Sequence, residues 1–233
     1  MAYLSRIEYL VGPEKIQRLK EKKVMLCGCG GVGSFVAEAL CRSGLGHIVL
    51  VDHDVVDPSN LNRQLMTDRD NIGMSKVEAL AQRLEKVSDT QVETIDAFID
   101  ENFALPEKYD YVVDCIDTLT CKYALVRKCH EAGIPVLSSL GSARRLKPEN
   151  IRLTTLDRTR NDPLAKAFRN IVKKDGYRKK IEVVYVDTPA MKTGIVREGD
   201  THKEKYPLAS GIFVVGSVGL FIAETVFERL TEE

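Results

Sequence analysis

The chain has 233 residues, and its 34 basic and 34 acidic side chains leave a formal net charge of zero. This length and a hydrophobic content of 44% fit one globular α/β domain, or one domain with an extension. The N-terminal residues include Arg6 and Glu8 and lack an apolar block, so we expect no secretory signal peptide.

The six cysteines contain no C-x-x-C pair, so the usual spacing of a structural zinc site is absent. Most of them lie in apolar segments, which predicts small buried residues in a reducing, cytoplasmic compartment. They are Cys27, Cys29, Cys41, Cys115, Cys121 and Cys129.

Residues 1–22 are predicted to form an N-terminal arm, in which Gly12 and Pro13 open a short helix because proline suits the first helical turn. Residues 24–52 then predict a strand, a glycine-rich turn, a helix and a second parallel strand. The turn contains Gly28, Gly30, Gly31 and Gly33.

Each glycine of such a turn has a physical role: one permits a tight bend, one lets a phosphate approach the bare main chain, and one lets the helix pack on the strand. The N–H groups at the helix start then face the phosphate. Asp52 follows Gly33 by 19 residues, where an acid can bind a ribose hydroxyl. The pattern predicts nucleotide binding, with a merely tight turn as the alternative. The glycines alone do not distinguish a dinucleotide from ATP.

Alternating strand and helix patterns continue to residue 140. A polar loop over 53–64 lies at the edge where open α/β sheets bind ligands. One helix is predicted to begin within 73–76 and run to about 87, and another to follow residue 118 and run to about 132. Strands are predicted over 91–95, 109–114 and 133–137. This order predicts an α/β fold with a Rossmann-like, doubly wound, mostly parallel sheet, in which residues 23–140 form the nucleotide-binding core.

Residues 141–233 are predicted to extend the same domain. They contain strands over 151–155 and 181–186, a helix that Asp162 and Pro163 cap, and a mobile loop over 188–206. Residues 207–223 carry no charge, which suits either a membrane span or a helix buried against the sheet. We favour the buried helix, because 17 residues are at the lower limit for a span and three of them are glycines.

Residues 157–180 contain nine basic and three acidic residues, a local net charge of +6. Two interpretations are open: a solvated helix face, or a docking surface for a polyanion such as RNA. The candidate RNA-binding residues are Arg158, Arg160, Lys166, Arg169, Lys173 and Lys174, and Arg144 and Arg145 extend this set.

Several features of the first half form a more specific pattern together than any of them alone. They are the glycine turn, Asp52-x-Asp54, the block 60–64, Lys76 and Asp117. Over residues 23–140 they resemble the adenylating superfamily that includes ubiquitin-activating enzymes and the activating enzymes of molybdopterin and thiamine biosynthesis. In that superfamily a carboxylate attacks the α-phosphate of ATP, and pyrophosphate leaves.

This resemblance implies the site residues. Arg63 and Lys76 would hold cationic charge where the leaving phosphates gain negative charge, and Asp117 would bind Mg²⁺ through the ATP phosphates. Arg6 lies in a segment like the superfamily's N-terminal arginine segment, which reaches the phosphates of a partner subunit and so implies a homodimer. The implied catalytic residues are Asp117, Arg63, Lys76 and Arg6, and the implied ATP-binding residues are Gly28, Gly30, Gly31, Gly33, Asp52, Asp54, Asn62, Arg63, Gln64, Lys76 and Asp117. For each charged residue, a surface charge or a helix cap is the structural alternative.

The second half indicates the branch of the superfamily. The segments 138–143, 157–166 and 183–187 resemble the tRNA threonylcarbamoyladenosine dehydratases. That family uses ATP to activate the threonyl carboxylate of a modified adenosine beside the tRNA anticodon, after which the side group closes a ring and AMP leaves. Ring closure is intramolecular and needs no protein nucleophile. This suits a chain in which no cysteine follows Cys129.

The expected function is therefore ATP- and Mg²⁺-dependent dehydration of threonylcarbamoyladenosine, with tRNA as the partner and no role for DNA. One alternative is adenylation of the C-terminus of a ubiquitin-like or sulfur-carrier protein. Another is an NAD-binding protein, in which the block 60–64 and Lys76 have no role. The last alternative is a protein that is attached to a membrane through residues 207–223. The resemblance also implies a link to a cysteine-desulfurase sulfur relay, which nothing in the sequence tests.

Overall fold

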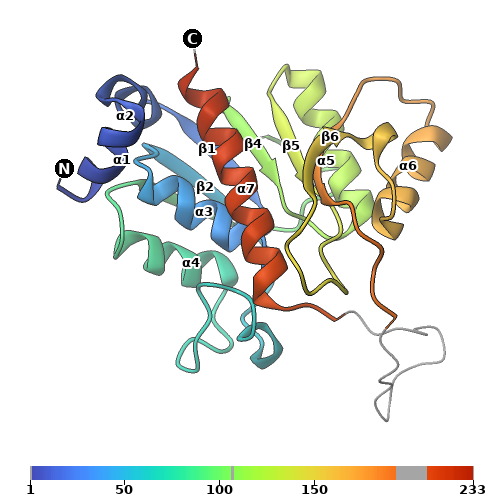
Figure 1. Cartoon of the computed structure of the whole chain (residues 1–233), viewed down its shortest axis with the longest axis horizontal. Helices are drawn as coiled ribbons and strands as arrows, with labels where there is room; N and C mark the ends of the chain where they lie inside the picture. The colour runs from blue at the N-terminus through green and yellow to red at the C-terminus, as the bar shows by residue number, and fades with distance from the viewer. Residues whose placement is uncertain (1, 106–107, 193–208, 233) are drawn as a thin grey trace.

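The computed structural model describes residues 2–105, 108–192 and 209–232, which fold around a seven-stranded sheet (Figure 1). The strands are β1 (Lys23–Cys27), β2 (His47–Asp52), β3 (Gln91–Asp96), β4 (Tyr111–Asp114), β5 (Val136–Ser139), β6 (Ile151–Thr155) and β7 (Glu182–Val186). Their order is β3-β2-β1-β4-β5-β7-β6, and every neighbouring pair is parallel except β6 and β7. The predicted fold class is confirmed.

Helices cover both faces of this sheet (Figure 1). The α-helices are α1 (Ser5–Val11), α2 (Pro13–Lys20), α3 (Gly33–Arg42), α4 (Lys76–Glu85), α5 (Leu119–Ala132), α6 (Pro163–Lys174) and α7 (Ile212–Thr231), with short 3₁₀ turns η1 (Ala2–Leu4), η2 (Pro58–Asn60) and η3 (Leu156–Arg158). α2, α3, α4 and α7 pack on one face, and α5 and α6 pack on the other.

The central strands β1, β2 and β4 are largely apolar because both of their faces are covered. Val24 and Leu26 of β1 belong to the core under α3 and α7, whereas Met25 and Cys27 belong to the core under α5 and α6. Successive side chains of a strand point to opposite faces, so a strand between two helical layers needs apolar residues at every position. This packing fixes the strand ends, and therefore the loops that carry the polar residues.

α7 crosses α3 at very close range (Figure 1). A methyl group on Gly219 would lie 2.6 Å from the carbonyl oxygen of Val32 and 2.7 Å from Cβ of Phe35. Only glycine allows this approach, which brings the start of α7 to the glycine-rich turn. Among the residues that the structure describes, none of the helices has the length and apolar character of a membrane span.

The structure differs from the sequence prediction in a few places. α1 is not predicted by the sequence pattern; it ends at Gly12, whose φ of +88° turns the chain directly into α2. β4 begins at Tyr111 instead of residue 109. Most of the predicted loop over 188–206 lies outside the described residues. The six cysteines form no disulfide, and all except the half-buried Cys115 are buried.

Candidate nucleotide and substrate site

The carboxyl ends of β1 to β5 open into a pocket of about 900 Å³. We divide it into two halves. The glycine-turn half is lined by the turn after β1, the ends of β2 and β3, Lys76 and residues 115–118. The α6 half is lined by residues 139–145, the start of α6, Ala190 and Ser210. Open α/β sheets bind their ligands at this edge.

The glycines of the turn separate into packing and exposed positions. Gly28 has a φ of +94°, and a methyl group there would lie 2.7 Å from the carbonyl carbon and oxygen of Cys115. A methyl group on Gly33 would lie 1.9 Å from the carbonyl oxygen of Gly28. Gly28, Gly30 and Gly31 line the pocket, and a methyl group on Gly30 would meet only the side chain of Gln64, at 4.0 Å. The turn therefore packs tightly against the neighbouring main chain on one side. On the side of the pocket it presents bare main chain at the start of α3, where the helix dipole favours an anion.

Asp52 joins the end of β2 to the glycine turn. One carboxylate oxygen accepts a hydrogen bond from the N–H of Cys29 at 2.6 Å, and the other accepts one from the N–H of Asp54 at 2.9 Å. The half-buried side chain also lines the pocket. Each carboxylate oxygen keeps further acceptor capacity, so the group is held in place and can still accept a hydrogen bond from a hydroxyl group.

Two cations reach the glycine-turn half. Lys76, the first residue of α4, is 7% exposed, and its Nζ lies 2.6 Å from Oδ2 of Asp54. Arg63 follows a loop that reciprocal hydrogen bonds between Asp57 and Asn60 make rigid. Its Nη1 donates to the carbonyl oxygen of Ser59 at 2.8 Å. Both side chains line the same pocket as the turn, and Cγ of Arg63 would lie 3.5 Å from a methyl group on Gly31.

Two further predicted residues differ in their placement. Gln64 is 6% exposed and lines the pocket, and its Oε1 has no hydrogen-bond partner among the described residues. A buried amide oxygen without a partner is costly and favours a bound donor. Asn62 is exposed instead, and its Nδ2 donates to the carbonyl oxygen of Ser210 at 2.9 Å. Asn62 thus ties the loop after β2 to the start of α7, and it is not part of the pocket lining.

A fully buried ion pair supports the segment after β4. Nζ of Lys122 and Oγ of Ser138 both donate to Oδ2 of Asp114 at 2.7 Å, and all three side chains have no exposed surface. Oδ1 of Asp114 accepts the N–H of Ile116 at 3.1 Å. The buried network therefore fixes the path of residues 115–117. Asp117 stands at the end of this path, exposed and on the pocket wall.

Arg145 and Asp162 shape the α6 half. The guanidinium of Arg145 donates to four backbone carbonyls, those of Gly141, Ala143, Asn161 and Thr188. Asp162 caps α6 through the N–H of Leu164 and also accepts the N–H of Gly141 at 3.0 Å. Burial raises the pKa of Asp162 and lowers the pKa of Arg145. Arg145 is 8% exposed, so it holds the pocket wall and does not extend an exposed basic surface as the sequence suggests.

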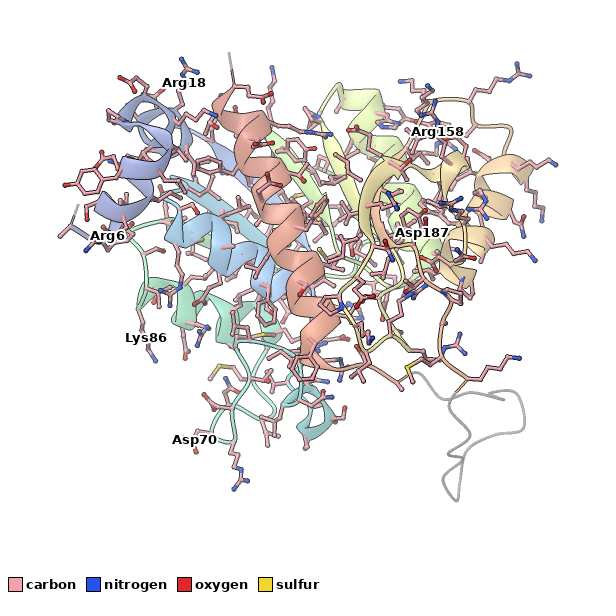
Figure 2. All side chains as sticks on the ribbon, viewed as in Figure 1. Arg6, Arg18, Asp70, Lys86, Arg158 and Asp187 are labelled. Carbon is pink, nitrogen blue, oxygen red and sulfur yellow. The ribbon has the colours of Figure 1, made fainter. Side chains whose placement is uncertain are left out.

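The remaining basic residues differ in their exposure and place. Arg144 lines the α6 half, and Arg169 is half-buried, with its guanidinium on the carbonyl oxygen of Thr159 at 3.0 Å. Arg158, Arg160, Lys166, Lys173 and Lys174 are exposed. Arg6 is exposed on α1, away from the pocket of its own chain (Figure 2).

The sequence reasoning missed the supporting residues Asp114, Lys122 and Ser138, and the bracing role of Arg145. An aspartate at the end of a strand with a lysine eight residues later, between Cys121 and Tyr123, was the available signal for the ion pair. Phe98 was also missed. It is half exposed at the pocket wall, and its ring lies 4.7 Å from that of His53, edge to face.

Comparisons with known proteins agree with this geometry. Residues 3–163 match the model of the ThiF family. The tRNA threonylcarbamoyladenosine dehydratase of Bacillus subtilis is 35% identical over 98% of this chain and 94% of its own length. The adenylyltransferase and sulfurtransferase UBA4 of Vanderwaltozyma polyspora is 36% identical over only 63% of this chain and 35% of its own length.

Comparison with solved structures also finds similarity to a tRNA threonylcarbamoyladenosine dehydratase. The crystal structure of the Escherichia coli tRNA N6-threonylcarbamoyladenosine dehydratase in complex with ATP superposes with a TM-score of 0.89 at 28% identity. The superposition covers 98% of this chain and 93% of that one. It therefore extends beyond the glycine-turn half to the strands and helices that build the α6 half.

Proposed function

This chain belongs to the ThiF family, and we propose on that premise that it is an ATP-dependent enzyme that dehydrates threonylcarbamoyladenosine in tRNA. One observation carries the proposal: the similarity to the dehydratase of Bacillus subtilis covers 98% of this chain, including the second half. A nucleotide-binding fold by itself supports many reactions. The second half builds the α6 half of the pocket, so similarity there bears on the substrate.

The reaction has two steps. An oxygen of the threonyl carboxylate attacks the α-phosphate of ATP, and pyrophosphate leaves. The carbamoyl oxygen or nitrogen of the same side group then attacks the activated carbonyl carbon, and AMP leaves with the former carboxylate oxygen. Because the second attack is intramolecular, the enzyme need only hold the side group in a reactive conformation.

We propose that ATP binds in the glycine-turn half. Gly30 and Gly31 leave the main chain open to the phosphates, and Asp52 accepts a ribose hydroxyl. Lys76 and Arg63 face the leaving pyrophosphate, where fixed positive charge stabilises the transition state. Lys76 is already held by Asp54 at 2.6 Å, so its charge is in place before the nucleotide arrives. The unpartnered Oε1 of Gln64 adds an acceptor at this wall.

Asp117 is the residue that fits a magnesium ion. Mg²⁺ is commonly held by one or two carboxylates together with substrate phosphates, and the Asp117 carboxylate is exposed at the pocket wall without a salt bridge in the described part of the chain. When bound, the ion would neutralise charge on the phosphates. Asp117 supplies the anchoring carboxylate, and the buried pair of Asp114 and Lys122 sets the position of that carboxylate.

The α6 half would receive the modified adenosine. Its wall combines the apolar side chains of Leu140, Leu164 and Ala167 with the main chain of 141–145. Arg145 and Asp162 brace that main chain, so the wall is preformed. The exposed basic residues of 158–174 would contact the tRNA backbone. A tRNA substrate would also imply a cytoplasmic enzyme.

Assembly completes the proposal. Arg6 lies outside the pocket of its own chain, so a role at the phosphates requires a homodimer in which it reaches the partner's pocket. A cysteine-desulfurase sulfur relay stays a prediction of the family resemblance. The alternative function, adenylation of a ubiquitin-like or sulfur-carrier protein, has weaker support, because the similarity to UBA4 covers only 63% of this chain.

The test is nucleoside mass analysis of threonylcarbamoyl-modified tRNA after incubation with the protein, ATP and Mg²⁺. We expect the modified nucleoside to lose the mass of one water, and we expect Asp117→Ala to abolish the loss. Pyrophosphate exchange with tRNA or with a ubiquitin-like protein distinguishes the two substrates. Exchange that depends on the protein substrate alone would refute the dehydratase.

A further inference from the structure

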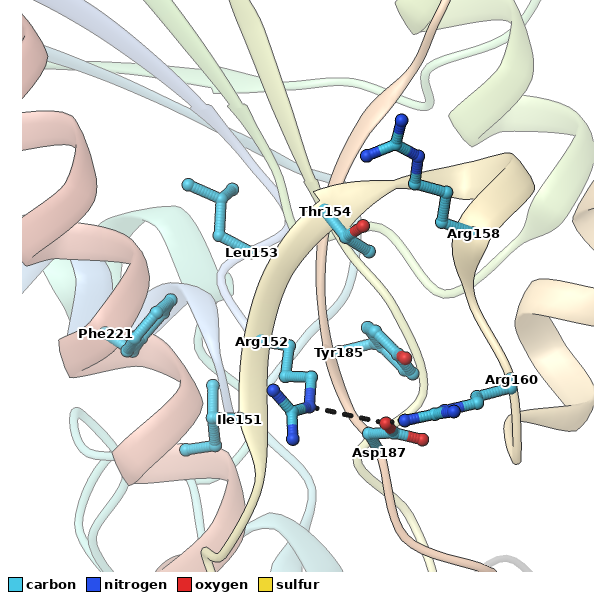
Figure 3. Close-up of a pocket in the computed structure, with 9 residues that line it drawn as sticks. All are labelled: Ile151, Arg152, Leu153, Thr154, Arg158, Arg160, Tyr185, Asp187 and Phe221. Carbon is cyan, nitrogen blue, oxygen red and sulfur yellow. Dashed lines mark hydrogen bonds and ion pairs between the residues drawn. The ribbon is translucent and has the colours of Figure 1, made fainter.

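A second, shallow hollow of about 580 Å³ lies on the outer surface of β6 and β7, at the edge of the sheet (Figure 3). It is lined by Ile151, Arg152, Leu153, Thr154, Arg158, Arg160, Tyr185, Asp187 and Phe221. Its three arginines come from separate places: Arg152 from β6, Arg158 from η3, and Arg160 from the turn before α6. The fold thus gathers three cations around one acid, a net charge of +2.

Asp187 holds two of these arginines in place. Its side chain is only 4% exposed, and its Oδ2 lies 2.9 Å from Nε of Arg160 and 3.3 Å from Nε of Arg152. Oδ1 accepts a hydrogen bond from Nδ2 of Asn161 at 3.0 Å. The carboxylate contacts both guanidinium groups at the Nε edge (Figure 3). The Nη groups of Arg152 have no hydrogen-bond partner in the described part of the chain.

Such an arrangement suits a phosphate. Guanidinium groups bind phosphate oxygens through paired N–H donors, and a buried acid that fixes two of them reduces the entropy lost on binding. Arg158 makes no hydrogen bond or salt bridge among the described residues, and the hydroxyl of Thr154 lines the hollow. One side chain of Asp187 cannot neutralise three cations, so the hollow favours a further anion.

The hollow adjoins the α6 half of the pocket at residues 160–162. Asn161 contacts residues of both: its side chain donates to Asp187, whereas its carbonyl oxygen accepts Nη2 of Arg145 at 3.1 Å. Arg160, on one side of Asn161, lines the hollow, and Asp162, on the other side, lines the pocket. Asn161 has a φ of +58°, a left-handed conformation that asparagine tolerates. The segment around Asn161 therefore links the two sites.

We propose that this hollow binds a backbone phosphate of the RNA strand whose modified adenosine enters the pocket. Arg152 and Arg160 donate to the phosphate oxygens, Arg158 adds charge, and Asp187 is a positioning residue. A nucleotide that enters the pocket carries its strand across the surface, and phosphate contacts of this kind fix the register of a nucleic acid. The proposal rests on the proposed function, since it requires an RNA substrate.

The experiment compares two double variants that each remove two positive charges. Arg152→Gln with Arg160→Gln alters the hollow, and Arg69→Gln with Lys86→Gln alters exposed residues that line neither cavity. Binding of fluorescent threonylcarbamoyl-modified tRNA is measured between about 50 and 200 mM salt. We expect the hollow variant to bind roughly tenfold more weakly and its salt slope to fall by about 0.7, the value for one single-strand phosphate contact.

Each outcome decides the question. A loss of affinity with a raised KM for tRNA in the hollow variant, and not in the control, supports the phosphate site. Equal tRNA affinities of the two variants overturn it. Light scattering measures the oligomeric state of the hollow variant. If that state changes while the tRNA affinity equals that of the control, the hollow contacts a second copy of the chain, and the phosphate site is also overturned. If the wild type neither binds nor modifies tRNA, the proposed function itself fails.

Discussion

Replacing Lys122 by methionine tests how the buried ion pair supports the segment 115–117 at the pocket. Lys122 and Asp114 have no exposed surface, and Nζ and Oδ2 are 2.7 Å apart. The variant leaves the Asp114 carboxylate buried, and in the described part of the chain its remaining donors are the hydroxyl of Ser138 and the N–H of Ile116. Because removing one partner leaves an uncompensated charge in the core, we expect the free energy of unfolding to fall by about 3–5 kcal/mol.

Urea unfolding at neutral pH, followed by circular dichroism, measures this loss. Lys22→Met is the matched control, since Lys22 pairs with Asp110 at 3.2 Å but the two side chains are 33% and 35% exposed. An exposed pair contributes about 0–1 kcal/mol. Adding Asp114→Asn to Lys122→Met removes the stranded charge and should restore part of the stability. A Lys122→Met loss no larger than that of the control would refute the reasoning.

The same variant has a functional consequence. Asp114 also holds the N–H of Ile116, one residue before Asp117. Titration calorimetry without urea, at a temperature where the variant is still folded, measures binding of ATP in the presence of Mg²⁺. We expect the variant to bind ATP more weakly than the wild type does. Lys22→Met should bind as the wild type does. Unchanged affinity in a folded Lys122→Met protein would show that the ion pair stabilises the core without positioning Asp117.

Three further predictions follow from packing and burial. Gly33→Ala would place a methyl group 1.9 Å from the carbonyl oxygen of Gly28, so calorimetry should detect no ATP binding; wild-type affinity would contradict the packing. Arg145→Met removes the donors to four carbonyls and should lower the unfolding free energy by about 2–4 kcal/mol, with faster hydrogen exchange in 141–145. Burial raises the pKa of Cys41 from 9.0 to about 12. Iodoacetamide at about pH 8 should therefore label Cys41 only after unfolding. Stability should also fall as the pH rises from 9 toward 12, because the unfolded thiol loses its proton first; rapid labelling of the native protein would refute this.

Some of the site could be predicted because its function is encoded in local spacing. The glycine turn and Asp52 belong to one strand–turn–helix–strand unit, and their separation along the chain fixes their separation in space. The same holds for Asp162, which caps α6 through the N–H of Leu164, two residues later. In such units the main chain leaves few other arrangements.

The rest depends on contacts between distant segments. Arg145 pairs with the carbonyl of Thr188, 43 residues later, and in the sequence it is simply one of two adjacent arginines beside a basic stretch. Lys122 likewise reads as a polar position of an ordinary helix until β4 and β5 bring Asp114 and Ser138 to it. Burial decides the role of both residues, and burial is set by the assembled sheet.

The close crossing of α7 over α3 makes the nucleotide pocket a product of the last part of the chain. The expected nucleotide-binding residues all precede residue 118, yet Val215 lies so near the turn that a methyl group on Gly31 would be 3.3 Å from it. During synthesis on a ribosome, the pocket therefore lacks the wall that contains Val215 until α7 has emerged and packed on α3. Nucleotide binding would then require a docked α7, and a product that stops before α7 would bind poorly although it contains every motif.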